Sequence, residues 1–451
     1  MSYGGEIGIL GAGESGVGAA RLAQAKGYLP FVSEFGAIKP AFRDELLEAG
    51  IAFEEKGHST ERLSRVEFVI KSPGIPEEAP VVQQLRAQQV PVISEIEFAA
   101  RYTKATLIAI TGTNGKTTTT ALTYHVLQQA GLDVKVAGNI GTSFARSLLQ
   151  RDADYFVLEV SSFQLDDIAR FHPHISVVLN ITPDHLDRYH GSMYEYVSAK
   201  LRITENQHRK DIFLYNARDY WTIQNLQNLT GDPQLIGINL ESPQSRIAYW
   251  NQSTQQLRVG EANFDLESLA LRGAHNYFNM TVAILIGQHL GVPEATIRKA
   301  LTSFRGSPHR LEKITQVESV AFYNDSKATN VDATLQALRS FQKPIIWIAG
   351  GIDKGNDYRL LEKAVRKHVH HLVVLGEENE KLLAFFEPRV GALTQVFSMP
   401  EAVQAAFDVA PPESVVLLSP ACASFDLFEN YARRGDAFRE AVKQLIPSRQ
   451  L

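Results

Sequence analysis

A glycine-rich turn followed by a lysine and hydroxyl residues is the most informative chemical feature of the chain. The apolar run 106–111 is followed by Gly112-Thr-Asn-Gly115, and Lys116 and Thr117 then open a helical pattern. The N–H groups of such a turn converge on one point, and the helix N-terminus adds positive potential there. Lys116 can reach the terminal phosphates of a nucleotide, while Thr117 or Thr118 can hold Mg²⁺. The pattern therefore predicts that the chain uses ATP.

The match to the phosphate-loop motif is imperfect. A strict G-x4-G-K-[ST] pattern needs glycine at position 110, where this chain has Ile110. The alternative is a plain glycine-rich structural turn, but the strand and the helix that flank it favour phosphate binding.

A second glycine run lies near the N-terminus. Gly11, Gly13 and Gly16 fit the G-x-G-x-x-G fingerprint, and Glu34 ends the next apolar run at a spacing that suits a ribose hydroxyl. Alone, this run would suggest an NAD enzyme, although the same turn would accept any nucleotide diphosphate. A purely structural turn is again the alternative.

Acidic and imidazole groups follow two later apolar runs. Glu159 comes directly after the run 155–158, where a carboxylate could hold the Mg²⁺ that Thr117 also contacts, or could simply cap a helix. The segment Asp184-His185-Leu-Asp187-Arg188-Tyr189-His190 has two histidines and two aspartates in seven residues. It could form a second metal site or a site that orients a substrate.

Further polar groups have several interpretations. The helical pattern around Lys200 predicts a solvated surface lysine, whereas Asn276 and Asn279 share a helix face and could read an adenine or ribose edge. Charged and hydroxyl groups also cluster in later segments, and we expect Ser424 to lie near a helix start. These segments are His309-Arg310, Asn324 to Asn330, Gly350 to Gly355 and Ser419 to Phe425.

The elements that must position these groups alternate between strands and helices in three successive sets. This pattern predicts an α/β fold of three domains: a Rossmann-like N-terminal domain, a central phosphate-loop ATPase domain with a mostly parallel sheet, and a third α/β domain at the C-terminus. We expect them at 1–99, 100–306 and 307–451. The region 246–266 alternates like a small antiparallel hairpin, and Gly306-Ser-Pro308 resembles a hinge.

Composition limits the functional class. The chain has 451 residues, 44% hydrophobic and 21% charged, with a formal net charge of −5, which argues against general attraction to nucleic acid. Its one cysteine, Cys422, fits a reducing compartment and is expected to be a packed residue. With no signal-peptide pattern and no apolar stretch of membrane-spanning length, a cytoplasmic protein is expected.

Together these segments resemble the Mur ligases over essentially the whole chain, most closely the members that add D-glutamate. Three segments are the most specific to those members: Asp187-Arg188-Tyr189, the run Asp325 to Asn330 and the run Ser419 to Ser424. The segments that carry the resemblance are Thr111 to Thr117, Glu159-Val-Ser-Ser, Asp184 to Tyr189, His275-Asn276, His309-Arg310, Asn324 to Asn330 and Ser419 to Ser424.

The resemblance implies an ATP-dependent amide ligase of peptidoglycan precursor synthesis that joins D-glutamate to UDP-N-acetylmuramoyl-L-alanine. It implies a UDP-binding N-terminal domain, a central ATPase domain and a C-terminal dinucleotide-fold-like α/β domain that closes on them. It also implies two Mg²⁺ ions and a carbamate formed from CO₂ on a lysine. A monomer is expected, with these small molecules as its partners.

The resemblance also assigns roles to individual residues. Lys116, Glu159, His185 and Lys200 are expected to be catalytic, with Lys200 as the carbamylated lysine instead of a surface one. The metal positions are Thr117, Glu159, His185 and Lys200. The ATP positions are Gly112, Thr113, Asn114, Gly115, Lys116, Thr117, Thr118, Asn279, Arg310, Asp325 and Lys327. The UDP-substrate positions are Gly13, Ser15, Glu34, Ser72, Asn139, Ser161 and His185. The D-glutamate positions are Thr329, Lys354, Ser424, Phe425 and Tyr431.

Three positions depart from the family pattern. Glu34 replaces a usual aspartate, Phe425 a common leucine and Tyr431 a common phenylalanine. The alternatives are an NAD-dependent oxidoreductase, which leaves the Lys116 loop unexplained, and a phosphate-loop switch, which needs no first or third domain. A sibling amide ligase for meso-diaminopimelate or folylpolyglutamate is the nearest competitor.

Overall fold

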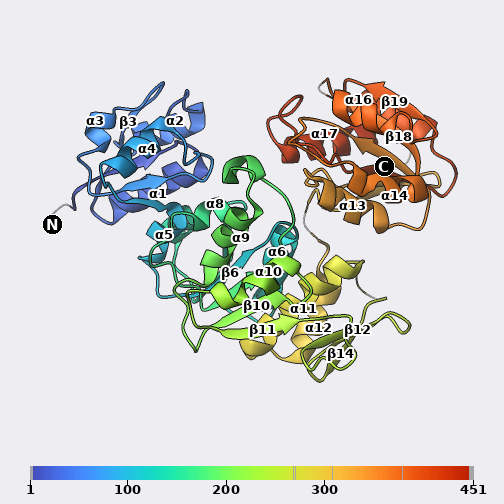
Figure 1. Cartoon of the computed structure of the whole chain (residues 1–451), viewed down its shortest axis with the longest axis horizontal. Helices are drawn as coiled ribbons and strands as arrows, with labels where there is room; N and C mark the ends of the chain where they lie inside the picture. The colour runs from blue at the N-terminus through green and yellow to red at the C-terminus, as the bar shows by residue number, and fades with distance from the viewer. Residues whose placement is uncertain (1–3, 268, 270, 307, 378, 446–451) are drawn as a thin grey trace. The chain divides into compact units, whose positions relative to one another are not determined.

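The computed structural model describes residues 4–267, 269, 271–306, 308–377 and 379–445. The chain divides into two compact units, one of residues 1–270 with 276–304 and one of residues 271–275 with 305–451 (Figure 1). The first unit contains two parallel sheets and a small antiparallel sheet, and the second contains one mixed sheet. The predicted α/β fold class is confirmed.

The N-terminal sheet of the first unit has the strand order β3-β2-β1-β4-β5, and every pair is parallel. This is the order of a dinucleotide-binding half, in which ligands bind beyond the carboxyl ends of the strands. Its strands are β1 (Glu6–Leu10), β2 (Leu29–Ser33), β3 (Ala52–Glu54), β4 (Val69–Lys71) and β5 (Val92–Ser94). Its helices are α1 (Glu14–Ala25), α2 (Pro40–Glu48), α3 (Thr60–Leu63), α4 (Pro80–Ala87) and α5 (Glu95–Ala100).

The central sheet has the order β11-β10-β9-β6-β8-β7, again parallel throughout. Because β6 lies between β8 and β9, loops that leave three neighbouring strands meet at one edge. Its strands are β6 (Thr106–Thr111), β7 (Val134–Gly138), β8 (Tyr155–Glu159), β9 (Ile175–Val178), β10 (Ile212–Asn216) and β11 (Gln234–Ile238).

Helices of the central part connect these strands and follow them. They are α6 (Lys116–Gln129), α7 (Phe144–Gln150), α8 (Ser162–Leu165), η1 (Leu186–Tyr189), α9 (Met193–Leu201), η2 (Arg202–Thr204), α10 (Tyr220–Asn225), η3 (Leu226–Asn228), α11 (Ala274–His289) and α12 (Glu294–Ser303). None of the helices in the described residues is long and apolar enough to cross a bilayer.

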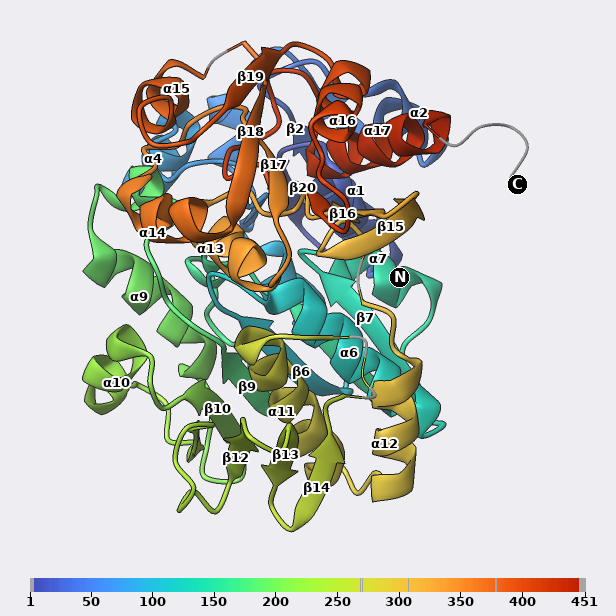
Figure 2. The same ribbon diagram turned by 90° about the vertical axis from the view of Figure 1, so that its right-hand side faces the viewer.

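The expected hairpin at 246–266 is a three-stranded antiparallel sheet, with β13 paired on both sides. Its strands are β12 (Ala248–Asn251), β13 (Gln256–Val259) and β14 (Ala262–Asp265). Figure 2 shows it beside α11 and α12, where the ring centroid of Trp250 lies 4.9 Å from that of Tyr277.

Buried carboxylates connect the N-terminal and central parts of the first unit. Glu97, in α5, has no exposed surface, and one of its oxygens accepts the N–H groups of Ala169, Arg170 and Phe171 at 3.0, 2.8 and 2.7 Å. Its other oxygen accepts from the Arg101 guanidinium at 3.0 Å. Because both carboxylate oxygens have charge-assisted or backbone partners, this burial is compensated.

The sheet of the second unit has the order β15-β16-β20-β17-β18-β19, with only the edge strand β15 antiparallel. Trp347 is fully buried at its centre. Its strands are β15 (Glu312–Val317), β16 (Val320–Asn324), β17 (Ile345–Ala349), β18 (Val369–Leu375), β19 (Leu393–Val396) and β20 (Val415–Leu418). Its helices are α13 (Val331–Arg339), α14 (Arg359–His368), α15 (Glu380–Phe386), α16 (Met399–Asp408) and α17 (Tyr431–Gln444).

The expected limits of the three domains stay predictions. The limit at 99/100 falls at the end of α5, just before β6 begins at Thr106. In the presumed hinge, Ser307 lies outside the described residues.

Glu95, beside Glu97 on α5, provides a test of the packing between the two parts. Its carboxyl accepts the Ala145 N–H at the start of α7, and burial raises its pKa to about 7. A raised carboxyl pKa means that the folded state holds the proton more tightly, so stability falls as pH rises from about 4.5 to about 7.

We therefore expect Glu95→Gln, which keeps the acceptor oxygen, to gain stability relative to wild type as pH rises. The gain is on the order of 3 kcal/mol at most, because one pKa unit corresponds to about 1.4 kcal/mol. Urea unfolding at about pH 5 and about pH 8 measures it. Glu61→Gln, in an exposed pair with Arg65, is the control. A stability difference for Glu95→Gln that does not change with pH would contradict the expectation.

Candidate active site

The loop between β6 and α6 has the backbone that a phosphate-binding turn requires. Gly112 and Gly115 have φ angles of 148° and 89°, which side-chain-bearing residues rarely adopt. A Cβ atom at Gly115 would lie 2.9 Å from Asn279 Oδ1, so the loop packs directly against α11. Ile110 is fully buried inside β6, which explains why this position need not be glycine.

Asn180, at the exit of β9, fixes this loop. Asn114 N donates to Asn180 Oδ1 at 2.8 Å, and Asn180 Nδ2 donates to the Asn114 carbonyl at 3.0 Å. Thr113 N donates to the Asn180 carbonyl at 2.9 Å, and the Thr113 hydroxyl donates to the Thr182 carbonyl at 3.0 Å. The sequence analysis missed Asn180, because an amide at a strand exit has no signal that separates it from an ordinary turn residue.

Two lysines donate to one carbonyl in the loop. Lys116 Nζ lies 2.7 Å from the Gly112 carbonyl oxygen and 2.9 Å from that of Thr113, and Lys200 Nζ lies 3.2 Å from the Gly112 oxygen. Lys200 is only 2% exposed, so the surface position that its helical pattern predicts is wrong. Burial, and then the charge of Lys116, hold the pKa of Lys200 well below its usual value. Its amine is therefore nucleophilic at lower pH than that of an ordinary lysine.

Glu159 ends β8 beside this loop, as expected, and its side chain is buried. Oε1 accepts from Asn139 Nδ2 at 3.2 Å, while Oε2 is buried with no hydrogen-bond partner in the described part of the chain. A carboxylate oxygen in that position fits a cation. Thr117 is also buried, in the first turn of α6.

These groups fit Mg²⁺ better than a metal held by protein alone. Across the described ranges, no group of three or more His, Cys, Asp or Glu side chains is arranged to hold a metal ion. Mg²⁺ commonly binds one or two carboxylates together with substrate phosphates, so Glu159 and Thr117 suffice as its protein ligands.

The two histidines of the segment 184–190 have different surroundings. His185 precedes η1 with a φ of 53°, its ring centroid lies 5.2 Å from that of Phe163, and its Nε2 lies 3.7 Å from Asp184 Oδ2. His190 lies between two other carboxylates, with Nδ1 at 2.9 Å from Glu195 and Nε2 at 3.2 Å from Glu78. His185 therefore remains the candidate metal ligand or substrate contact. His190 instead pairs with Glu78 and Glu195.

The N-terminal glycine turn also has specific partners. Ala12 N donates to Glu34 Oε2 at 2.8 Å, and Gly36 N donates to Glu34 Oε1 at 3.0 Å. The Ser72 hydroxyl, which is buried without a hydrogen-bond partner in the described ranges, would lie 2.7 Å from a Cβ atom at Gly11. The turn, Glu34 and Ser72 thus lie together, as the predicted nucleotide-substrate contacts require.

Of the remaining predicted UDP-substrate positions, one has free space around it and the others lie at helix ends or hydrogen-bond to neighbours. A Cβ atom at Gly13 would meet nothing within 4 Å, and Ser15 lies in the first turn of α1. The Ser161 hydroxyl accepts from Gln164 N at 3.3 Å and caps α8. Asn139, by its amide, contacts Glu159.

In the second unit, Asp325 is buried among polar partners. Ser419 Oγ donates to Asp325 Oδ2 at 2.9 Å, and Leu311 N donates to Oδ1 at 3.1 Å. Burial raises the pKa of Asp325 to about 7, although the charge of Arg310 acts in the opposite direction. Lys327 Nζ lies 5.2 Å from the ring centroid of Tyr431.

Backbone pairing brings together the loops that carry the predicted D-glutamate residues. Ile352 and Ala423 exchange two N–H···O bonds of 3.0 Å, which places the Lys354 loop beside that of Ser424. Phe425 is 69% exposed and Lys354 is exposed, whereas Ser424 is buried. The expected helix start near Ser424 is wrong, because α17 begins at Tyr431.

The sequence analysis also missed Arg434, a buried guanidinium that connects these loops. It donates to the Ser326 hydroxyl at 3.1 Å, to the Ser326 and Cys422 carbonyls at 3.0 and 3.1 Å, and to the Ala423 carbonyl at 3.3 Å. Cys422 is buried beside it, and burial raises its thiol pKa to about 11, which supports the packed role predicted from the sequence.

Asn180→Ala tests whether this amide fixes the phosphate loop. It removes one acceptor and one donor, so we expect a loss of about 1–2 kcal/mol in unfolding free energy and at least tenfold weaker ADP binding by calorimetry. Asn225→Ala, which removes an amide that donates to a carbonyl within α10 at 2.8 Å, is the control. Unchanged ADP affinity in Asn180→Ala would show that the loop holds its shape alone.

Comparison with known proteins identifies the family. The MurD N-terminal domain matches residues 6–81, the Mur ligase middle domain matches 110–287, and the Mur ligase glutamate ligase domain matches 309–422.

Curated relatives match almost the whole chain. A UDP-N-acetylmuramoylalanine–D-glutamate ligase of Porphyromonas gingivalis is 46% identical over 98% of this chain and 99% of its own. One of Bacteroides thetaiotaomicron is 47% identical over 97% of this chain and 99% of its own, and one of Salinibacter ruber is 42% identical over 97% of both.

Solved structures show the same fold at low sequence identity. The UDP-N-acetylmuramate–alanine ligase MurC of Thermotoga maritima has a TM-score of 0.61 and 20% identity, over 98% of this chain and 100% of that one. The MurF ligase of Thermotoga maritima, in complex with ADP, has a TM-score of 0.61 and 13% identity, over 92% and 96% of the two chains. The chain belongs to the Mur ligase family and, within it, to the UDP-N-acetylmuramoylalanine–D-glutamate ligases.

Proposed function

We propose that this chain joins D-glutamate to UDP-N-acetylmuramoyl-L-alanine in peptidoglycan precursor synthesis, with conversion of ATP to ADP and phosphate. The observation that carries this proposal is the phosphate loop beside Glu159 and Lys200, in a chain that is 46% identical over 98% of its length to a relative of that name.

The chemistry explains why ATP is needed. A carboxylate is a poor electrophile, so a carboxylate oxygen of the alanyl group first attacks the γ-phosphorus, ADP leaves, and an acyl phosphate forms. The amine of D-glutamate then attacks the acyl carbon and loses a proton. Phosphate leaves the tetrahedral intermediate by cleavage of the C–O bond and takes one original carboxylate oxygen with it.

The residues of the phosphate loop bind and orient the nucleotide. Lys116 Nζ, which donates to two loop carbonyls in this structure, would exchange them for terminal phosphate oxygens and offset charge on the transferred group. The amides of the loop and of the first turn of α6 would hold the remaining oxygens. Asn279, against Gly115, would contact the nucleotide from α11.

Two Mg²⁺ ions fit the remaining donors, with Thr117 and Glu159 as ligands of one and His185 and a carbamylated Lys200 as ligands of the other. When bound, these ions would neutralise charge on the phosphates. The depressed pKa of Lys200 supports carbamylation, because only a neutral amine adds to CO₂. The product is an anion, which would also remove the repulsion between Lys200 and Lys116.

We assign the substrates to parts of the chain on the same basis. In the first unit, the UDP-substrate contacts are Gly13, Ser15, Glu34, Ser72, Asn139, Ser161 and His185. In the second unit, Arg310, Asp325 and Lys327 contact ATP, and D-glutamate contacts Thr329, Lys354, Ser424, Phe425 and Tyr431. Cations and hydroxyls among the latter would satisfy its two carboxylates.

The proposal includes three domains at 1–99, 100–306 and 307–451 and a monomer in the cytoplasm. It includes no nucleic-acid partner, since the formal net charge of −5 offers no general attraction to phosphate backbones.

Phosphate release tests the substrate assignment. We expect release to require UDP-N-acetylmuramoyl-L-alanine and D-glutamate together, because aminolysis completes turnover, and the product mass to equal their sum less one water. L-glutamate and meso-diaminopimelate are the matched controls. Equal release with either one would favour a sibling ligase. Oxygen-18 placed in the alanyl carboxylate should appear in the phosphate, and its absence there would contradict the acyl-phosphate step.

Lys200→Ala tests the carbamate. We expect at least a hundredfold loss of turnover, partly restored by formate or acetate, because a small carboxylate can replace the lost anion. Lys116→Ala should lose turnover without such rescue, since its role needs a cation. Titration of bicarbonate-depleted wild-type enzyme with CO₂ should restore activity. A failure of both rescue and CO₂ dependence would exclude the carbamate.

A further inference from the structure

The loop 72–75 follows β4 and carries a side chain that the proposed substrate needs. Ser72 N donates to the Leu10 carbonyl at 3.0 Å, so the loop begins beside the glycine turn after β1. Its hydroxyl, as noted above, is buried and has no hydrogen-bond partner in the described ranges. The position of this loop therefore determines where a buried hydroxyl is presented.

Arg188, from the central part of the same unit, holds this loop by its carbonyl groups. Its Nη2 donates to the Pro73 and Ile75 carbonyls at 3.4 and 3.0 Å, and its Nη1 donates to the Gly74 carbonyl at 3.3 Å. One planar guanidinium thus contacts three consecutive residues, a geometry that a lysine cannot reproduce.

Arg188 also contacts Phe163, an aromatic residue beside a candidate catalytic histidine. Its guanidinium carbon lies 4.4 Å from the ring centroid of Phe163, in α8, the helix that follows Glu159. Arg188 lies in η1, directly after His185, whose ring also packs on Phe163. The same side chain therefore contacts the substrate loop and the aromatic ring that supports His185.

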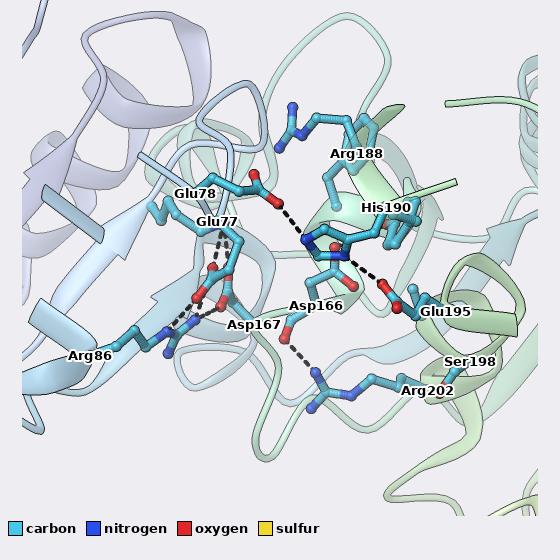
Figure 3. A pocket seen from close by; sticks show the side chains of 14 residues that line it. Glu77, Glu78, Arg86, Asp166, Asp167, Arg188, His190, Glu195, Ser198 and Arg202 are labelled. Atoms are coloured by element: carbon cyan, nitrogen blue, oxygen red, sulfur yellow. Dashed lines mark hydrogen bonds and ion pairs between the residues drawn. The ribbon is translucent and has the colours of Figure 1, made fainter. Parts of the chain in front are cut away.

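Lys71 makes a second connection at the base of the loop. It is 4% exposed, its Nζ lies 3.0 Å from Asp167 Oδ2, and it donates to the Ile75 carbonyl at 3.3 Å. Asp167 follows α8 and also pairs with Arg86. Figure 3 shows Arg86 and Glu77 converging with Asp167 in the pocket of about 370 Å³ that Arg188 and Lys71 line.

Arg202 lines the same pocket but has different partners. It donates to the carbonyls of Asp166 and Ile168 and pairs with Glu205, all in the central part. It resembles Arg188 in charge and in carbonyl contacts, but its partners in the described part of the chain include neither the loop 72–75 nor the Phe163 ring. This makes it a matched control.

We propose that Arg188 is a positioning residue, which together with Lys71 holds the loop 72–75 against α8 and η1 and so aligns the UDP-substrate with the phosphate loop. This inference rests on the proposed function, and it assigns a role to the Asp187-Arg188-Tyr189 step that the reaction itself does not use. Arg188 acts through Ser72, Phe163 and His185, and not on the reacting atoms.

The experiment compares Arg188→Ala, Arg188→Lys and Arg202→Gln with wild type. We expect Arg188→Ala to raise the KM for UDP-N-acetylmuramoyl-L-alanine about tenfold or more, with the KM for ATP changed less than about twofold. Arg188→Lys should give a KM for this substrate between those of wild type and Arg188→Ala, because an ammonium cannot donate to all three carbonyls in the geometry of a guanidinium. Arg202→Gln should leave both KM values near wild type, even where it lowers the thermal midpoint.

Hydrogen exchange without substrates provides a measurement that does not depend on the reaction. The Ile75 amide, which donates to the Ser72 carbonyl at 3.1 Å, should exchange faster in Arg188→Ala and unchanged in Arg202→Gln. Wild-type enzyme that is inactive with both substrates would reject the proposed function. An active wild type with unchanged KM or unchanged exchange in Arg188→Ala would reject the positioning role, as would equal effects in Arg202→Gln.

Discussion

The carbonyl oxygen of Gly112 receives two lysine side chains, and much of the candidate site follows from this crowding. Lys116 is held there by the turn that it closes, and Lys200 reaches the same oxygen from α9. Two ammonium groups this close, one of them fully buried, disfavour the doubly charged state. This crowding supports the proposed binding of phosphate oxygens at Lys116 and the proposed carbamate on Lys200.

The loop can sustain this arrangement because residues just after β9 hold it by hydrogen bonds. Asn180 provides an acceptor and a donor to Asn114, and its carbonyl takes the Thr113 N–H. These bonds hold the turn in its shape before a ligand binds. Where water is excluded, hydrogen bonds from a backbone that is already held in place are stronger than they would be in water.

The sequence was sufficient to predict those site residues that lie at the ends of parallel strands. Glu159 was expected at a strand end, and the parallel register places it opposite Ile110 on the neighbouring strand. The packed helices show where such reasoning fails. The helical pattern predicted a solvated Lys200, and Arg434 was missed, yet both side chains are only 2% exposed. Their burial depends on which loops pack over the helix, and no local spacing encodes that contact. For Lys200, only the resemblance to a family corrected the prediction.

The substitution at position 34 has a physical consequence that follows from its contacts. Glu34 already accepts the Ala12 N–H in the glycine turn and the Gly36 N–H beyond β2. A phosphate could take the Ala12 amide only by displacing a carboxylate of the same charge sign, which is unfavourable. A ribose or uracil group can instead donate to the free lone pairs of that carboxylate. The longer glutamate thus keeps the hydrogen-bond acceptor that an aspartate would supply. In the complex that we propose, it would direct the diphosphate toward Gly13 and the first turn of α1, where a Cβ atom built on Gly13 meets no neighbour.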